Sequence, residues 1–599
     1  MPKIQHYRGN PLRKLYFCFS TNTIRMHVFN SISRVLALFS LSFLAYGQYQ
    51  PQGWTQEKEE KALEWVETTY NNLSQDEKLG QLFIVALYTN KGESEIQKVK
   101  AIVEKEKIGG LILMQDDAKR EVELLNELQP KAKVPLLIGM DAEWGLYQRI
   151  EKAYKLPWAL SLGAIQDKSL VYEMSSQIAK DARRMGIQWV FAPVVDVNTN
   201  PNNPIIGNRS FGSTVENVVN SARAYTKGLQ DHNVLAAIKH FPGHGDTDTD
   251  SHLDLPVVSH SIERLEKIEL APYYKMLEDG VGGVMVAHLY VPSLEKKSGV
   301  PASVSSEIVE GLLKKKMGYK GLIITDALNM GAVAKRYQPG ALDLQAFKAG
   351  NDIMLFSQGV KEGKKQIAEA IEKGEIPRER LEESVKKILL TKYYLGLDRF
   401  EKIPLDNLDR DLNNSEHQEL SQKLYAHSLT LLKNKDAFLP LSKNETYYYL
   451  PLEEASSKVM TEILGKESQV KLVSAKTLGQ IPSGAKVLIG LHKDNSTAYK
   501  PFKISSSSRA IIEKLKQKHK VGVVLFGSPY GLGPLNLKGI SSVLVAYENH
   551  PDAMKASADG LLGESPITGR LPVEVNKELQ AGSGMDLPVT QLEAKLSTP

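Results

Sequence analysis

Short apolar runs alternate with longer amphipathic segments between about residues 80 and 360. Most runs are rich in valine, isoleucine and leucine, which is typical of strands buried on both faces of a parallel sheet. The runs cover residues 82–87, 110–114, 135–140, 188–195, 234–238, 283–287, 322–325 and 353–356. Helical patterns lie between them, for example over 169–185, 262–278 and 307–316. Eight strands with intervening helices predict a (β/α)8 TIM-like barrel.

A second region of alternation follows a polar stretch. With 599 residues the chain is too long for a single hydrophobic core. Residues 396–420 are rich in Asp, Asn and Glu, as expected of a linker, and beyond them strands are expected over 446–450, 487–491, 521–526 and 543–547, with helices over 508–517 and 552–562. We therefore predict a barrel domain over 55–395, a linker over 396–420, and an α/β/α sandwich domain with an open sheet over 421–599.

Polar side chains follow the predicted barrel strands at the point where each strand ends. They are Asp141, Asp196, Lys239 with His240, His288 and Asp326, after the third to the seventh strand. Barrel enzymes carry their catalytic groups at the carboxyl ends of the strands. The pattern therefore predicts an active site at this end of the barrel.

The first 47 residues differ from the rest of the chain. Arg25 and Arg34 precede the apolar run 35–44, and the small residues Ala45 and Gly47 follow it. This order is typical of a secretory signal, and the run is too short to span a bilayer comfortably. We expect export to the periplasm or the medium, a mature chain that begins near Gln48, and no integral membrane span after cleavage. Translation from either Met1 or Met26 would carry this signal, and a buried N-terminal helix is the alternative interpretation.

Composition excludes several kinds of site. The one cysteine of the chain, Cys18, lies in the predicted signal region, so the mature protein has no thiol for a disulfide, a thiolate metal site or a nucleophile. The net charge is +5 and no basic block interleaved with aromatic residues is present, so nucleic acid is not expected as a partner. A glycine-containing loop over 527–531 lacks the spacing of a nucleotide-binding fingerprint.

The loop over 239–252, after the fifth strand, carries three histidines and three aspartates. Asp246, Asp248 and Asp250 have the start of an EF-hand spacing, but Ser251 replaces its glycine and Val257 its final glutamate. A transition-metal site of His240, His244 and His252 is an alternative, although Pro242 and two glycines disfavour a helix that would align these rings.

The third interpretation of the loop is acid–base catalysis. Asp250 and His252 are two residues apart, so in an extended segment their side chains share a face and the carboxylate can orient the imidazole. Asp326, at the end of the seventh strand, could then act on the other side of a bond. Two such groups flanking one bond form the geometry of glycoside hydrolysis.

These motifs resemble those of family 3 glycoside hydrolases of the β-N-acetylhexosaminidase type, over most of residues 75–395. The resemblance is carried by the loop 239–252 and by the segments 139–143 with Arg149, 192–198, 207–212, 301–303 and 325–330. Residues 420–580, with 432–434 early and 569–573 late, look like the second α/β sandwich domain of that family.

The resemblance implies a role for each motif residue. Asp326 would be the nucleophile of a retaining reaction, and His252, held by Asp250, the general acid and then the general base. Asp141, Arg149, Arg209, Lys239 and His240 would bind the terminal sugar, and no metal or cofactor would be needed. The chain departs from the family pattern after Asp141, where Trp144 stands near the pocket; it could alter the aglycone side or pack on the barrel rim.

The expected activity is that of an exported retaining exo-β-N-acetylglucosaminidase. Its expected substrates are peptidoglycan fragments or chitooligosaccharides with a terminal N-acetylglucosamine. The alternatives are a β-glucosidase or a β-N-acetylglucosaminide phosphorylase of the same family, and a non-catalytic sugar-binding protein.

Overall fold

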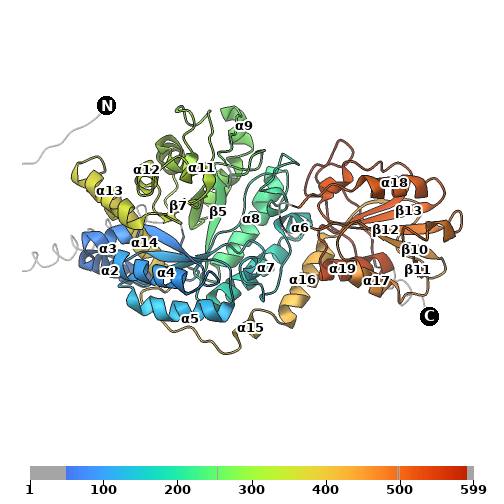
Figure 1. Ribbon diagram of the computed structural model, residues 1–599, viewed down its shortest axis with the longest axis horizontal. Coiled ribbons are helices and arrows are strands. Elements are labelled where there is room, and N and C mark those ends of the chain that lie inside the picture. The colour runs from blue at the N-terminus through green and yellow to red at the C-terminus, as the bar shows by residue number, and fades with distance from the viewer. Residues whose placement is uncertain (1–48, 252–253, 496, 498–499, 590–599) are drawn as a thin grey trace, which may run out of the picture. The chain divides into compact units, whose positions relative to one another are not determined.

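The computed structural model describes residues 49–251, 254–495, 497 and 500–589 (Figure 1). The predicted signal region and His252 lie outside the described residues. No helix in the described part of the chain has the length and apolar character to cross a membrane.

Eight parallel strands form the barrel predicted from the sequence (Figure 1). They are β1 (Phe83–Leu87), β2 (Gly110–Leu113), β3 (Leu137–Met140), β4 (Trp189–Val190), β5 (Leu235–Phe241), β6 (Gly283–Val286), β7 (Leu322–Thr325) and β8 (Met354–Leu355). Their order in the sheet is β7-β6-β5-β4-β3-β2-β1-β8. A parallel bridge between Ile324 and Ile353 joins β7 to β8 and closes the barrel.

Helices lie between the barrel strands along the chain, and others precede β1 or follow β8. They are α2 (Gln56–Asn72), α3 (Gln75–Gly80), α4 (Glu93–Glu106), α5 (Ala118–Leu128), α6 (Ala159–Ala164), α7 (Ser169–Arg184), α8 (Val215–Gln230), α9 (Ile262–Lys267), α10 (Ala271–Glu278), α11 (Gly331–Ala334), α12 (Ala341–Ala349), α13 (Val360–Glu372) and α14 (Arg378–Tyr394). In α7 the buried residues Leu170, Met174 and Ile178 recur every four positions, so one face of the helix packs inward.

Two elements differ in detail from the sequence pattern. The apolar run 188–195 forms only the two-residue strand β4 and, beyond it, an isolated parallel bridge between Val194 and Lys239 of β5. The helix expected over 307–316 is present as a π-helix, η5 (Glu307–Lys316). Neither difference changes the number of barrel strands.

A second, mixed sheet forms beyond the barrel, with helices on both faces. Its strands are β9 (Thr430–Asn434), β10 (Tyr447–Leu452), β11 (Val470–Leu472), β12 (Lys486–His492), β13 (Lys520–Phe526) and β14 (Ile540–Val545), and their order is β11-β10-β12-β13-β14-β9. β9 pairs antiparallel with β14 at one edge. The sequence pattern indicated four of these strands and missed the edge strands β9 and β11.

The helices of this second sheet pack against two separate cores. α16 (Ser415–Ser428), α17 (Lys458–Leu464) and α19 (Pro551–Leu562) contribute Tyr425, Met460 and Met554 to one core. α18 (Ser506–Leu515) contributes Ile512 and Leu515 to the other. This arrangement is the predicted α/β/α sandwich. The short helix α15 (Leu408–Asp411) and the start of α16 lie inside the segment predicted as a linker, and the domain boundaries remain predictions.

Candidate active site

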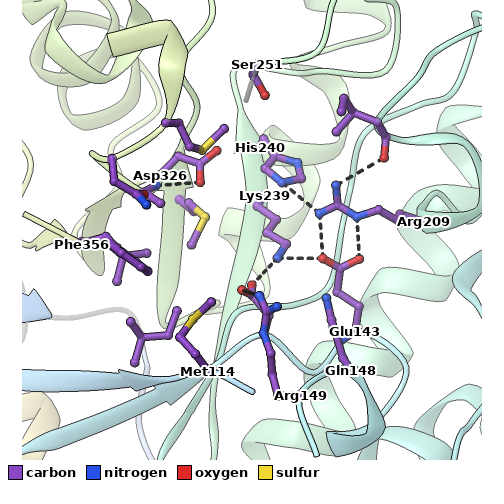
Figure 2. Close-up of a pocket in the computed structure, with 18 of the residues that line it drawn as sticks. Met114, Glu143, Gln148, Arg149, Arg209, Lys239, His240, Ser251, Asp326 and Phe356 are labelled. Carbon is purple, nitrogen blue, oxygen red and sulfur yellow. Dashed lines mark hydrogen bonds and ion pairs between the residues drawn. The ribbon is translucent and has the colours of Figure 1, made fainter. Parts of the chain in front are cut away.

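A cavity of about 630 Å³ opens at the carboxyl ends of the barrel strands (Figure 2). Six of the residues singled out from the sequence line it together: Asp141, Arg149, Arg209, Lys239, His240 and Asp326. In Figure 2, Asp326 lies on one side and Glu143 with Arg209 on the other, with Lys239 and His240 between them. The structure therefore brings these six residues to one site, and their individual roles stay predictions.

Lys239 and His240 are neighbours in β5, yet both line the cavity. In a regular strand, successive side chains point to opposite faces. Here the pairing of β5 with β6 shifts register between Ile238 and Phe241. Such an irregularity redirects side chains next to many active sites, and it lets this strand present two polar groups to one space.

Lys239 is the centre of an ionic cluster at the base of the cavity. Its Nζ lies 2.9 Å from Asp141 Oδ1 and 2.9 Å from Glu143 Oε1, and its side chain is only 3% exposed. Arg149 also pairs with Asp141. Burial raises the pKa of Asp141, but the charges of Lys239 and Arg149 outweigh burial and hold that pKa well below its usual range.

Arg209 and Glu143 form a bidentate pair at the other end of the same cluster. Arg209 Nε donates to Glu143 Oε2 at 2.9 Å, and its Nη2 donates to Oε1 at 2.7 Å. Burial raises the pKa of Glu143, but Arg209 and Lys239 outweigh it and lower that pKa to about 2. Both carboxylates of the cluster are thus ionised at neutral pH, in a geometry suited to directional bonds with hydroxyl groups.

Asp196 holds His240 from behind. The imidazole Nδ1 of His240 lies 2.7 Å from Asp196 Oδ2, and the backbone N–H of His244 donates to Asp196 Oδ1 at 2.7 Å. The other ring nitrogen of His240 lies 3.3 Å from Arg209 Nη2. Because a guanidinium can only donate, a hydrogen bond at this contact requires the nitrogen to accept and the ring to donate from Nδ1 to Asp196.

His244 connects the start of the loop after β5 to its end. Its Nδ1 lies 2.7 Å from Thr247 Oγ1, and its Nε2 lies 3.3 Å from Ser251 Oγ. Ser251 lines the cavity and stands between the two residues of the predicted acid–base pair. Asp250 is described and does not line the cavity, and His252 lies outside the described residues. The predicted catalytic pair is therefore not tested.

Asp326 follows β7, and its own backbone N–H donates to Val286 O at 2.8 Å. Its Oδ1 accepts the N–H of Ala327 at 2.8 Å. Burial raises the pKa of this carboxyl, but His288, Lys239 and the N–H of Ala327 outweigh burial and hold the pKa below its usual range. Asp326 is therefore an ionised carboxylate facing a closed space, as a nucleophile requires.

Aromatic and apolar side chains form the rest of the wall. Trp144 and Trp158 stack with ring centroids 4.2 Å apart and planes tilted by 30°. Met114, Met285, Met330 and Phe356 line other parts of the cavity. Thr497 is the one lining residue contributed by the second sheet's domain, among the residues described there. Trp144 thus lines the cavity and packs on a neighbouring ring, and an effect on the aglycone side stays a prediction.

The alternative metal interpretations are disfavoured by the contacts of the same side chains. One nitrogen of His240 faces a guanidinium, which repels a cation. Asp246, His260 and Glu269 lie close enough together to hold an ion. Arg264, however, pairs with both carboxylates, at 3.4 Å from Asp246 and 3.0 Å from Glu269. The cation of this group is therefore supplied by the protein itself.

Sequence reasoning missed several residues of the site. Glu143 lies in the motif 139–143 and had no predicted role, yet it pairs with two of the predicted binding residues. Its position two residues after Asp141 was the available signal. Trp158 and Thr497 had no local signal, because each reaches the cavity only through the tertiary fold.

The chain resembles known proteins both in sequence and in fold. The family model described as "Glycosyl hydrolase family 3 N terminal domain" matches residues 74–391. A "Beta-N-acetylglucosaminidase/beta-glucosidase" of Cellulomonas fimi is 30% identical over 393 residues, 64% of this chain and 69% of the relative. A "Beta-hexosaminidase A" of Pseudoalteromonas piscicida is 31% identical over 385 residues, 59% of this chain and 64% of the relative.

A solved structure resembles the chain over nearly its whole described length. It is the glycoside hydrolase family 3 β-N-acetylglucosaminidase of Paenibacillus sp. str. FPU-7, with 31% identity and a TM-score of 0.71. The match covers 84% of this chain and 99% of that structure, and so includes both domains.

Proposed function

Because this chain belongs to glycoside hydrolase family 3 and is a glycosidase, we propose that it is a retaining exo-β-N-acetylglucosaminidase. The substrate is a terminal N-acetylglucosamine on a peptidoglycan fragment or a chitooligosaccharide. The names of the relatives at about 30% identity support this sugar.

The observation that carries the proposal is the joint presence of Asp326 and the charged cluster in one cavity. Two carboxylates, two guanidinium groups, one ammonium and one imidazole offer the directional bonds that a polyhydroxylated ring requires. The ionised Asp326 faces the same space and can attack the anomeric carbon. A protein that only bound sugar would have no use for a nucleophile in this position.

In the proposed reaction, Asp326 displaces the leaving group and forms a glycosyl ester. His252, oriented by Asp250, donates a proton to the departing oxygen. It then takes a proton from the water that hydrolyses the ester, with net retention of configuration. Asp141, Arg149, Arg209, Lys239 and His240 hold the sugar, and no cofactor takes part.

A β-glucosidase is the principal alternative, since the Cellulomonas relative carries both names. As inferred from the family resemblance, β-glucosidases of this family usually take their acid/base from a glutamate of the second domain. Among the described residues that line the cavity, the second domain supplies Thr497 and no carboxylate. This lining favours the hexosaminidase with its histidine loop.

Turnover of matched aryl glycosides tests the proposal. We expect the 4-nitrophenyl β-N-acetylglucosaminide to exceed the β-glucoside in kcat/KM by at least about tenfold, or ~1.4 kcal/mol in transition-state binding. Added phosphate is expected to leave the rate and the product, free N-acetylglucosamine, unchanged. A preference for the glucoside would establish a β-glucosidase. N-acetylglucosamine 1-phosphate as the main product would establish a phosphorylase. No turnover of either glycoside would establish a binding protein.

A further inference from the structure

A buried glutamate of the second domain is bonded to the wall of the cavity. Glu548 follows β14, and its side chain is 2% exposed. Its Oε1 accepts the backbone N–H of Trp158 at 2.8 Å and the hydroxyl of Ser161 at 2.8 Å. Trp158 lines the cavity, so a single carboxylate oxygen links the second domain to the site.

The other oxygen of Glu548 binds the same barrel segment. Oε2 lies 3.3 Å from Lys155 Nζ, and that ammonium lies 5.9 Å from the ring centroid of Trp158. Glu548 therefore accepts two hydrogen bonds through Oε1 and makes one ion pair through Oε2, which accepts no hydrogen bond, all within residues 155–161. A buried carboxylate with this many partners fixes the backbone that carries the Trp158 ring.

Trp158 in turn contacts Trp144 and constrains its position. The two rings stack at 4.2 Å, and Leu156 N donates to Trp144 O at 3.3 Å. Trp144 directly follows Glu143, which pairs with Arg209 and Lys239. In Figure 2, Glu143, the residue before Trp144, lies across the cavity from Asp326.

We propose that Glu548 is a positioning residue that holds the stacked wall of Trp144 and Trp158, and thereby sets how tightly the cavity binds the sugar. It does not touch the reacting atoms. The wall adjoins Glu143 and its charged cluster, which the proposed function gives the task of holding the sugar, so displacement of the wall weakens binding more than it slows chemistry. The proposal gives the second domain a function at the site, and it rests on the proposed function only for the identity of the sugar.

Substitution of Glu548 tests this role, with a matched control, Asp552, from the start of α19, the helix that follows the Glu548 loop. Glu548→Ala removes all three interactions, and we expect KM to rise about tenfold while kcat changes by less than about twofold. Glu548→Gln keeps an acceptor for Trp158 and Ser161 and is expected to restore KM to within about twofold of the wild type. The control is Asp552→Ala: that side chain is equally buried and accepts the hydroxyl of Tyr154 at 2.6 Å, but has no bond to Trp158.

A double-mutant cycle separates positioning from general destabilisation. If Glu548 acts through the aromatic wall, Glu548→Ala has a smaller effect on KM in the Trp144→Ala protein than in the wild type, because half of the wall is already gone. The near-ultraviolet circular dichroism of the stacked indoles gives a second readout that needs no substrate. We expect Glu548→Ala to lose this signal and Asp552→Ala to keep it.

The outcomes decide the proposal independently of the sugar. A Glu548→Ala protein with the circular dichroism and KM of the wild type would overturn the proposal. Additive effects on KM in the double-mutant cycle would also overturn it, as would equal effects of Glu548→Ala and Asp552→Ala. If Glu548→Ala does not fold, Glu548→Gln and Trp144→Ala still carry the test: a Glu548→Gln protein that behaves like Trp144→Ala overturns the acceptor role. If the wild type hydrolyses no hexosaminide, the proposed function fails. The role of the wall is then still tested by the circular dichroism and by the KM for whichever substrate is turned over.

Discussion

Charge balance around Lys239 sets the electrostatics of the cavity. The ammonium contacts two carboxylates at 2.9 Å each, and those carboxylates are paired in turn with Arg149 and Arg209. Breaking a buried pair of this kind leaves an uncompensated charge and costs several kcal/mol. The cluster is therefore fixed in its ionised form before substrate arrives, which lowers the reorganisation that binding requires.

His244 gives the site a measurable dependence on acid. Burial, together with the neighbouring His240, lowers the pKa of His244 to about 4. A group whose pKa is depressed on folding stabilises the protein fully above its unfolded value, near 6.5, and less as the pH falls from 6.5 toward 4. From pH 7 to pH 5 we expect this histidine alone to remove on the order of 2 kcal/mol from the free energy of unfolding.

Urea unfolding of the wild type and of His244→Gln at the two pH values checks this expectation. All five tryptophans lie between residues 54 and 189, so their fluorescence reports on the barrel. The variant should lose less stability than the wild type on acidification. His492 has a pKa lowered by burial to a similar value, but it lies in the second domain and is present in both proteins. An equal acid loss in both proteins would show that His244 is not the titrating group.

For single residues, the sequence indicated which residues belong to the site better than it indicated which residues pair with one another. Asp141, Lys239 and Asp326 could be singled out because each follows an apolar strand. The pairing of Glu143 with Arg209 could not, because 66 residues separate them and neither stands at a strand end. The support of His240 by Asp196 likewise depends on two adjacent strands meeting in space.

Among the elements, the loop after β5 carries the predicted acid–base pair. If Asp250 and His252 act as one unit, the double substitution to Ala should cost little more than either single substitution. A dinitrophenyl leaving group departs with little proton donation, so formation of its glycosyl enzyme should suffer least. Pre-steady-state release of phenols of rising pKa measures this directly. Equal losses for all leaving groups would show that His252 only binds substrate.

The strand pattern was the strongest signal in the sequence, and the reason is burial. A parallel barrel strand is covered on both faces, so its sequence is a continuous run of apolar residues. β9 and β11 were missed because edge strands face solvent: two residues of β11, Lys471 and Leu472, are exposed. β4 is shorter than its apolar run because pairing beyond Val190 is reduced to an isolated bridge at Val194, a difference that a hydrophobic pattern does not register.

For the whole molecule, the architecture was predictable and the coupling between its parts was not. The barrel and the sandwich follow from the alternation of apolar and polar segments along the chain. The contact of Glu548 with Trp158 joins residues 390 positions apart, and no local pattern indicates it. Export rests on the signal-like segment before Gln48, which lies outside the described residues and stays a prediction.

The central claim is that Asp326 is the nucleophile of a retaining hexosaminidase. The most direct test uses a 5-fluoro-N-acetylglucosaminyl fluoride, whose anomeric carbon accepts the carboxylate as fluoride leaves and whose glycosyl ester hydrolyses slowly. Mass spectrometry of the digested protein should find one added glycosyl group on the peptide that contains Asp326, and none in Asp326→Ala. A label on another carboxylate, or turnover with inversion and no covalent species, would contradict the account.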